Sequence, residues 1–371
     1  MKMNFVVPCL LGLEGLIADE LKALDAENVI CENGRVLFSG DEYMLARANI
    51  NCRYAERIQI LVGSFTAKSF EELFEGTKAL EWEQWIGEED AFPVKGYSIN
   101  STLFSVSDCQ SIIKKAVVER LKSRYSVEWF TETGAVHQIQ FSIMKDNVSL
   151  LLDTSGAGLH KRGYRLDAND APIKETLAAS LCCISRLKPY HTLYDPMCGS
   201  GTILIEGALL ANNIAPGINR NFSAERWDII DPSVWTAERQ RAKDLERHDT
   251  QFAAYGSDID SSAIENAKQN AARAGVDKMI YFSVCDVKDF TPATERGTLI
   301  CNPPYGERLL DLKQAEEIYK VMGKKFEKRH GWSYSIISPS DDFELFFGRK
   351  ADKRRKLYNG MIKCQVYMYF K

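Results

Sequence analysis

Four consecutive residues, Asn302-Pro303-Pro304-Tyr305, combine hydrogen-bond acceptors with an aromatic ring. The apolar segment 298–301 before them resembles a buried parallel strand, and the two prolines end it. Because proline has no N–H, the corner offers acceptors only, chiefly the side-chain oxygen of Asn302 and the carbonyl of Pro303. These oxygens can accept both protons of an exocyclic amine while its ring stacks on Tyr305. The motif predicts alkylation of an amino group on adenine, cytosine or guanine, and a plain proline turn is the alternative.

A glycine-containing loop, residues 196–202, lies between a predicted strand at 192–195 and a predicted helix at 203–211. Its glycines at 199 and 201 let the backbone turn tightly and let a ligand approach closely. The loop lacks the Gly-Lys-Ser/Thr of a nucleotide P-loop. It also lacks the third glycine of a dinucleotide fingerprint, because position 204 is leucine. The pattern predicts a small-molecule site that belongs to neither class.

Acidic residues end three successive predicted strands. Asp195 ends the strand before the glycine loop, Asp258 ends the strand at 253–258, and Asp286 ends the strand at 280–286. Ligands of open α/β sheets bind outside the carboxyl ends of the strands. There Asp195 can hold an ammonium or a water, Asp258 two ribose hydroxyls, and Asp286 an adenine amine. The set predicts S-adenosylmethionine as the cofactor, although each acid alone could be a helix N-cap.

The chain has 371 residues, a net charge of −4 and 45% hydrophobic residues. This length favours two or three domains. No apolar run approaches the roughly 18 residues needed to cross a bilayer, so no membrane partner is expected. Ten cysteines without a Cys-x-x-Cys pair, together with five scattered histidines, predict reduced thiols, a cytoplasmic location and no metal site.

Two basic clusters stand out against the negative net charge, at residues 160–165 and 349–356. The charge of the whole chain disfavours nonspecific coating of nucleic acid, but a local basic surface can still bind it. Tyr164 belongs to the first cluster and Tyr358 follows the second, and either ring could stack on a base. A solvated charged face is the alternative for both. The residues expected to contact RNA are Lys161, Arg162, Arg165, Lys353, Arg354 and Arg355.

The two halves of the chain differ in pattern. The first half mixes strands and helices as an α+β domain does, with Asn33-Gly34 as a hairpin signal. The second half alternates strands with helices, the pattern of a parallel sheet covered on both faces. Its first helix is expected to have Pro172 at the first helical position, and a later helix to begin with a capping box at Ser262 and Glu265. We expect an α/β chain divided into 1–44, 45–155, a linker at 156–170, and 171–371.

Residues 170–371 resemble a class I S-adenosylmethionine-dependent methyltransferase of the amino-methylating type. The runs Asp195 to Thr202 and Asn302 to Leu309 resemble those of RNA guanine-N2 methyltransferases. The N-terminal half is similar to the ferredoxin-like and THUMP modules that are joined to such enzymes. The chain as a whole is most similar to the bacterial 23S rRNA guanine-N2 methyltransferase family in its stand-alone form. The resemblance implies an N-terminal α+β module followed along the chain by a Rossmann-like domain with a seven-stranded, mostly parallel sheet.

The resemblance also assigns roles. It implies methyl transfer to the N2 amine of a guanosine in structured RNA, most simply 23S rRNA, with residues 302–305 as the catalytic corner. The alternatives are a tRNA guanine-N2 enzyme, an adenine-N6 enzyme acting on DNA or RNA, and a non-catalytic RNA-binding factor. The residues expected to bind S-adenosylmethionine are Asp195, Met197, Cys198, Gly199, Ser200, Gly201, Thr202, Asp258, Ile259, Asp286 and Val287.

Overall fold

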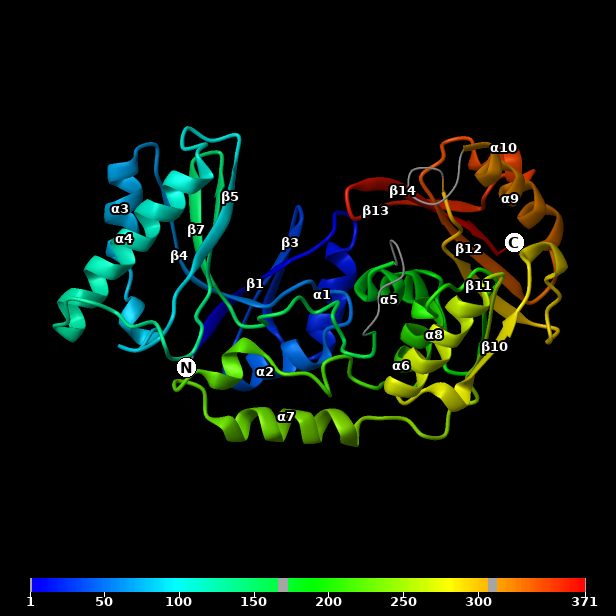
Figure 1. Cartoon of the computed structure of the whole chain (residues 1–371), viewed down its shortest axis with the longest axis horizontal. Coiled ribbons are helices and arrows are strands. Elements are labelled where there is room, and N and C mark those ends of the chain that lie inside the picture. Colours follow the sequence, from blue (N-terminus) through cyan, green and yellow to red (C-terminus); the bar gives the residue numbers. More distant parts are fainter. Residues whose placement is uncertain (1, 166–172, 306–311, 371) are drawn as a thin grey trace. The chain divides into compact units, whose positions relative to one another are not determined.

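Residues 2–165, 173–305 and 312–370 are described by this computed structural model (Figure 1). The chain divides into two compact units, and each unit collects segments that are distant in sequence. The first unit consists of Met1–Pro8, Ile17–Leu159 and Asn221–Gln240. The second unit consists of Cys9–Leu16, His160–Arg220 and Arg241–Lys371. The segments 9–16 and 221–240 therefore each belong to a different unit from their neighbours along the chain.

A seven-stranded sheet in the order β2-β3-β1-β4-β7-β6-β5 forms the first unit. Both β1 and β2 run antiparallel to β3, so they are parallel to each other with β3 between them. The expected hairpin at Asn33-Gly34 is confirmed, because Glu32 pairs with Arg35 and Gly34 has a φ of 75°. The strands are β1 (Met3–Pro8), β2 (Glu27–Glu32), β3 (Arg35–Gly40), β4 (Gln59–Thr66), β5 (Val94–Ile99), β6 (Ile139–Met144) and β7 (Asn147–Asp153).

The helices of the first unit cover this sheet, and α3 and α4 lie side by side (Figure 1). The boundary expected between residues 44 and 45 falls inside α2, and the proposed four-part division of the chain stays a prediction. The helices are α1 (Glu14–Ala23, which begins in the second unit), α2 (Glu42–Asn51), α3 (Phe70–Lys78), α4 (Val106–Tyr125) and the 3₁₀ turns η1 (Trp82–Gln84) and η2 (Ser223–Arg226).

The second unit contains the expected seven-stranded, mostly parallel sheet, in the order β10-β9-β8-β11-β12-β14-β13. The first five strands are parallel, whereas β14 is antiparallel to β12 and β13 is antiparallel to β14. The strands are β8 (Thr192–Asp195), β9 (Ala253–Asp258), β10 (Ile280–Val284), β11 (Gly297–Cys301), β12 (Trp332–Ser338), β13 (Lys353–Asn359) and β14 (Ile362–Tyr369).

Two hydrophobic cores cover the two faces of this sheet, because successive side chains of a strand point to opposite faces. Ile300 and Ile337 lie in the core with α5, α6 and α8, while Leu299 and Ile336 lie in the core with α9 and α10. Figure 1 shows these two helix groups on opposite sides of the strands. The helices are α5 (Glu175–Ile184), α6 (Thr202–Ala211), α7 (Pro232–Asp244, which begins in the first unit), α8 (Ser261–Arg273), α9 (Leu312–Lys325), α10 (Phe343–Phe347), η3 (Asp277–Met279) and η4 (Val287–Asp289).

Two predicted helix starts are wrong. Helix α5 begins at Glu175 after the extended residue Lys174, and Pro172 lies outside the described residues. The N-cap of helix α8 lies two residues before the expected Ser262, because the Asp260 carboxylate accepts a hydrogen bond from the backbone N–H of Ser262. Among the described helices, none is long and apolar enough to span a membrane.

Candidate functional site

The carboxyl ends of β8, β9 and β11 meet at one edge of the second sheet. The strands are parallel neighbours, so Asp195, Asp258 and Asn302 emerge at this edge as the sequence predicts. Strand β10 is shorter than expected and ends at Val284. Asp286 instead caps the 3₁₀ turn η4, where its carboxylate accepts from the backbone N–H of Lys288 at 3.0 Å. The carboxyl ends of these strands therefore bring together Asp195 and Asn302, which are more than 100 positions apart in the sequence.

Backbone hydrogen bonds hold the glycine loop against β9. The N–H of Cys198 donates to the carbonyl of Ser257 at 2.9 Å, and the N–H of Gly199 donates to Oδ2 of Asp258 at 2.9 Å. Gly201 caps α6 with a φ of 78°, and a Cβ on this residue would lie 3.1 Å from that of Ala267. Glycine is required there because an L side chain would be strained at this φ and crowded against α8.

The open side of the loop fits an adenosine-containing cofactor. Gly199 has a φ of 51°, and a Cβ built on it would meet no atom within 4 Å, so a ligand can approach the backbone. Each oxygen of Asp258 accepts one backbone N–H, from Gly199 or from Asp260. A carboxylate has about four lone-pair sites, so Asp258 retains capacity for two ribose hydroxyls. Ile259 follows with 71% of its surface exposed, which leaves an apolar face free beside the acid.

Asp195 lies below the loop rather than on its surface. It is 2% exposed, and its carboxylate accepts from the N–H of Met197 at 3.3 Å. Burial raises the pKa of Asp195 to about 7, and the nearby charge of Asp258 adds to this effect. Burial also raises the pKa of the adjacent Cys301 thiol. Asp195 therefore supports the loop from inside, and its direct contact with an ammonium group stays a prediction.

The remaining loop residues are mostly interior. Cys198, Ser200 and Thr202 are buried, and Met197 is half-buried. The hydroxyls of Ser200 and Thr202 lie 3.1 Å apart, and Asn270 of α8 donates to the carbonyl of Ser200 at 3.1 Å. A ligand at this loop would meet backbone atoms more than side chains. Val287, expected beside the adenine, is 8% exposed and packs in the core with α9.

An unsatisfied acceptor defines the corner after β11. The side-chain oxygen of Asn302 is buried and has no hydrogen-bond partner among the described residues. Pro303 is buried and Pro304 is half-buried, and neither offers a donor. A buried acceptor without a partner costs about 1–3 kcal/mol, so its retention points to a ligand that donates to it. Gly306 to Leu309, the rest of the run that resembles RNA guanine-N2 methyltransferases, lie outside the described part of the chain.

Tyr305 completes the corner and is anchored from a distant hairpin. It is 8% exposed, and its hydroxyl accepts from Nδ2 of Asn359, the last residue of β13, at 2.6 Å. The sequence analysis did not identify Asn359. The pair Asn359-Gly360 is a turn signal that locates the hairpin, but nothing local to it reveals a contact with a residue 54 positions earlier.

The RNA-contact expectation is wrong for Arg162 and Arg165. The side chain of Arg162 is 2% exposed and lies 3.4 Å from Glu206, which also accepts from the Tyr164 hydroxyl at 3.1 Å. Arg165 pairs with Glu175 at 3.0 Å and is also mostly covered. Burying an unpaired charge costs several kcal/mol, so covered arginines are normally paired. We therefore interpret these two arginines as ion-pair partners of carboxylates.

The other basic candidates are more accessible. Lys161 and Lys353 are exposed. Arg354 pairs with Glu344, and Arg355 donates to the carbonyl of Gly12 at 2.7 Å. RNA contact therefore stays a prediction for Lys161, Lys353, Arg354 and Arg355. Within the described residues, no group of three or more His, Cys, Asp or Glu side chains could hold a metal ion.

Comparison with known proteins identifies three modules. Residues 162–368 match the family model described as the RMKL-like methyltransferase domain. Residues 4–59 match the RlmL ferredoxin-like domain, and residues 67–153 match the THUMP domain. These matches confirm the expected kinds of module and their order along the chain.

Relatives match along the full chain. YpsC of Bacillus subtilis (strain 168), provisionally named an RNA methyltransferase, is 46% identical over 100% of this chain and 96% of its own. The ribosomal RNA large subunit methyltransferase K/L of Shewanella frigidimarina (strain NCIMB 400) is 34% identical over 99% of this chain. The match covers 52% of that protein, so the chain spans about half of its length.

Two solved structures share the complete fold. A Listeria monocytogenes protein, described as a predicted N6-adenine-specific DNA methylase, superimposes with a TM-score of 0.94 and 45% identity, covering 100% of this chain and 96% of that one. SMU.472, a protein crystallised with SAH, gives a TM-score of 0.94 and 40% identity over 100% and 98% of the two chains. SAH is the demethylated form of S-adenosylmethionine, so the expected cofactor is confirmed for the family.

A mostly parallel seven-stranded sheet, with acids and an Asn-Pro-Pro-Tyr corner at its carboxyl edge, defines a Rossmann-like methyltransferase domain. The α+β unit that accompanies it carries a THUMP domain. The chain belongs to the THUMP-containing, RMKL-like methyltransferase family.

Proposed function

We propose that this protein transfers a methyl group from S-adenosylmethionine to the exocyclic N2 amine of a guanosine in 23S rRNA. Membership of the methyltransferase family supports the reaction class. The similarity to large-subunit rRNA methyltransferases, over about half of their length, supports the substrate. A cytoplasmic location, suggested by ten cysteines without a Cys-x-x-Cys pair, is part of the proposal.

The observation that carries the proposal is the buried side-chain oxygen of Asn302, which lacks a partner among the described residues. An amine that donates one proton to this oxygen and one to the Pro303 carbonyl would satisfy both acceptors. Acceptors at the amine favour the positive charge that nitrogen gains as it is alkylated. No positioned base is needed, because the product cation is acidic enough to release its proton to water.

The other residues bind and orient. When bound, S-adenosylmethionine supplies an electrophilic methyl group on a positively charged sulfur. Asp258 would hold the ribose hydroxyls, and the backbone at Gly199 would allow close approach of the cofactor. Tyr305, fixed by Asn359, would offer its ring to the target base. Extracting that base from its stack costs a few kcal/mol, and less in an RNA loop.

The THUMP domain at residues 67–153 would bind the structured part of the RNA. Proteins recognise RNA mainly through its shape and through unpaired bases, so this module can present one nucleotide without reading a long sequence. tRNA with the same target amine is the alternative substrate. A non-catalytic RNA-binding role is disfavoured, because the cofactor acid at 258 and the amide at 302 are both retained.

Adenine-N6 methylation is the second candidate reaction. It is favoured by the similarity to the Listeria protein described as an adenine-specific DNA methylase. An adenine amine would satisfy Asn302 and Pro303 in the same way, so the corner alone does not separate the two bases. The accompanying THUMP domain supports RNA over DNA.

Mass spectrometry of nucleosides tests the proposal. Purified 23S rRNA, tRNA and duplex DNA that lack the modification are incubated with S-adenosylmethionine and either the full chain or an Asn302→Ala variant. We expect N2-methylguanosine in 23S rRNA with the native chain, and about 100- to 1,000-fold slower formation with the variant. N6-methyladenosine as the product, or equal rates for both proteins, would contradict the proposal.

A further inference from the structure

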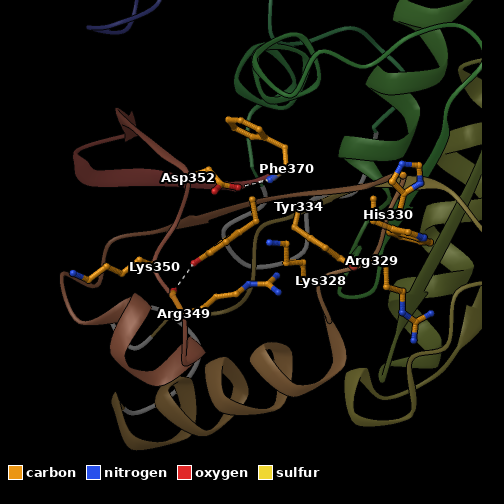
Figure 2. A pocket seen from close by; sticks show the side chains of 11 residues that line it. Lys328, Arg329, His330, Tyr334, Arg349, Lys350, Asp352 and Phe370 are labelled. Carbon is orange, nitrogen blue, oxygen red and sulfur yellow. Dashed lines mark hydrogen bonds between the residues drawn. The ribbon is translucent and has the colours of Figure 1, made fainter.

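A cavity lies in the methyltransferase unit, away from the corner at residues 302–305 (Figure 2). Its volume is about 610 Å³. The lining comes from the loop after α9, from the start of β12, from the loop between α10 and β13, and from Tyr369 and Phe370 at the end of β14. Cationic residues and aromatic rings dominate this lining, and Asp352 is its only carboxylate among the described residues.

The cavity lies at the amino ends of the parallel strands of the second sheet, and the catalytic corner lies at their carboxyl ends. Trp332, which lines the cavity, begins β12 and pairs with Gly297 at the start of β11. Asn302 follows the other end of β11. Cys301 lies four residues after Gly297 along β11, a distance of about 13 Å. A ligand in the cavity is therefore distinct from the cofactor and from the target base.

Among the residues that the structure describes, two cations of this cavity have no anionic partner. Figure 2 shows Lys328 and Arg349 extending from different loops toward the same part of the cavity, whereas Lys350 extends away from it. Within the described residues, no carboxylate lies at ion-pair distance from Lys328. The Nε of Arg349 is buried and has no hydrogen-bond partner there. Two like charges that face one space, one of them with an unsatisfied N–H donor of its own, are suited to an anion.

The protein fixes the arginine firmly in this position. Its guanidinium lies over the rings of Tyr334, Phe347 and Tyr369, with 5.4, 5.2 and 4.7 Å to their centroids. Nη2 of Arg349 also donates to the carbonyl of Phe326 at 2.7 Å. A cation held by stacking and by one hydrogen bond loses little freedom when an anion binds, which favours binding.

An exposed aromatic side chain also lines this cavity. Phe370 lines the same cavity and is 48% exposed, and its backbone N–H donates to Asp352 at 2.7 Å. This bond fixes the backbone and leaves the ring free. A cationic groove next to an exposed ring is the arrangement with which proteins hold single-stranded nucleic acid, the cations on phosphate and the ring on a base.

We propose that this cavity binds a single-stranded segment of the RNA substrate, with a phosphate between Lys328 and Arg349 and a base against Phe370. The inference rests on the RNA substrate of the proposed function and adds a second point of attachment on the methyltransferase unit itself. An RNA strand bound both here and at the catalytic corner would extend from one end of the parallel β-strands to the other. A free nucleotide or inorganic phosphate offers the same chemical groups and is the alternative ligand.

Fluorescence anisotropy with the full chain tests the site. The probe is a labelled single-stranded RNA of about 16 nucleotides, titrated over a series of salt concentrations. The variants are Lys328→Glu and Phe370→Ser. The matched control is Lys278→Glu, which changes the same charge on an exposed lysine of η3, before the edge strand β10. AMP and inorganic phosphate are titrated as competitors.

We expect Lys328→Glu to weaken RNA binding about tenfold and to reduce the slope of log K against log salt by about 0.7, the value for one lost phosphate contact. Phe370→Ser should weaken binding about fivefold or more without changing the slope, because stacking carries about 1–3 kcal/mol per base. Lys278→Glu should bind like the native chain. Equal affinities for Lys328→Glu and Lys278→Glu would overturn the proposal, as would Lys328-dependent binding of AMP as tight as that of RNA.

These outcomes are separable from those of the proposed reaction. Weakened RNA binding by Lys328→Glu supports the site even if the methylated nucleoside proves to be adenosine. Formation of N2-methylguanosine together with unchanged RNA binding by Lys328→Glu overturns the site and leaves the reaction standing.

Discussion

Nδ2 of Asn359 donates a hydrogen bond of 2.6 Å to the hydroxyl of Tyr305, and the two residues are 7% and 8% exposed. Asn359 is the last residue of β13 and pairs with Ile362 across a two-residue turn. The hairpin of the two antiparallel strands therefore fixes the aromatic ring of the catalytic corner. A side chain of the sheet, and not the loop alone, sets where a target base could stack.

Breaking this hydrogen bond should slow methylation without affecting the cofactor. We expect Asn359→Leu to reduce the rate on RNA about tenfold, because the Tyr305 ring loses its orientation and small misplacements are costly. Tyr305→Phe should have a similar effect, and the double variant should be no slower than either. Steady-state kinetics and SAH calorimetry measure both properties. Lys363→Gln, an exposed change on the same hairpin, is the control, and additive losses in the double variant would contradict the coupling.

Asp258 should control cofactor affinity. Asp258→Ala removes the acceptor of the Gly199 and Asp260 backbone N–H groups together with the expected ribose contact. We expect SAH binding about 10- to 100-fold weaker by calorimetry, because hydrogen bonds to a charged group contribute about 1.5–3 kcal/mol. Asp260→Ala is the matched control, since it removes only the α8 cap and should cost about 1 kcal/mol of stability. Unchanged affinity in Asp258→Ala would mean that another group holds the ribose.

Arg162 should affect stability and not RNA contact. Arg162→Met leaves Glu206 buried without its cation, so the free energy of unfolding should fall by about 3–5 kcal/mol. Lys161→Gln, a change on the exposed neighbour, should stay within about 0.5 kcal/mol. Urea unfolding of both variants measures the difference. If Arg162→Met were as stable as the native chain and bound RNA more weakly, Arg162 would be a surface contact after all.

Asp195 should make stability depend on pH. Its pKa is raised from the ordinary 3.8 to about 7 by burial, so between these values the folded state holds a proton that the unfolded state has released. The contribution of Asp195 to the free energy of unfolding is therefore greatest below about pH 4, and it is lost as the pH rises to about 7. The loss is of the order of 4 kcal/mol.

Asp195→Asn cannot titrate and should lack this fall. Urea unfolding at pH 5 and at about pH 8 measures it in both proteins. We expect the native chain to lose stability relative to the variant as pH rises. Parallel pH profiles for the two proteins would show that the Asp195 carboxyl is ionised in the folded state across this range.

Local sequence patterns predicted the strands β8 to β11 of the methyltransferase sheet, whereas β12, β13 and β14 were not predicted. Strands 192–195, 253–258 and 298–301 were predicted within a residue of β8, β9 and β11, because continuous apolar runs that end in glycine, proline or an acid are local signals. The misplaced starts have local causes as well. Asp260 competes with Ser262 for the same cap, and Asp286 caps η4 after β10 has ended. Sequence cannot decide which of several adjacent polar residues accepts a given N–H.

The sequence alone determined the acceptor-rich character of residues 302–305 and the order of the acids, because those depend on residue type and on strand ends. Only the tertiary structure decided which charges are buried. The cluster at 160–165 reads as a basic surface, yet Arg162 lies inside against Glu206, 44 positions later. Likewise, Asn359 reaches Tyr305, and segment 9–16 joins the second unit. Burial and long-range pairing follow from how distant elements pack, and no local pattern encodes which partners will meet.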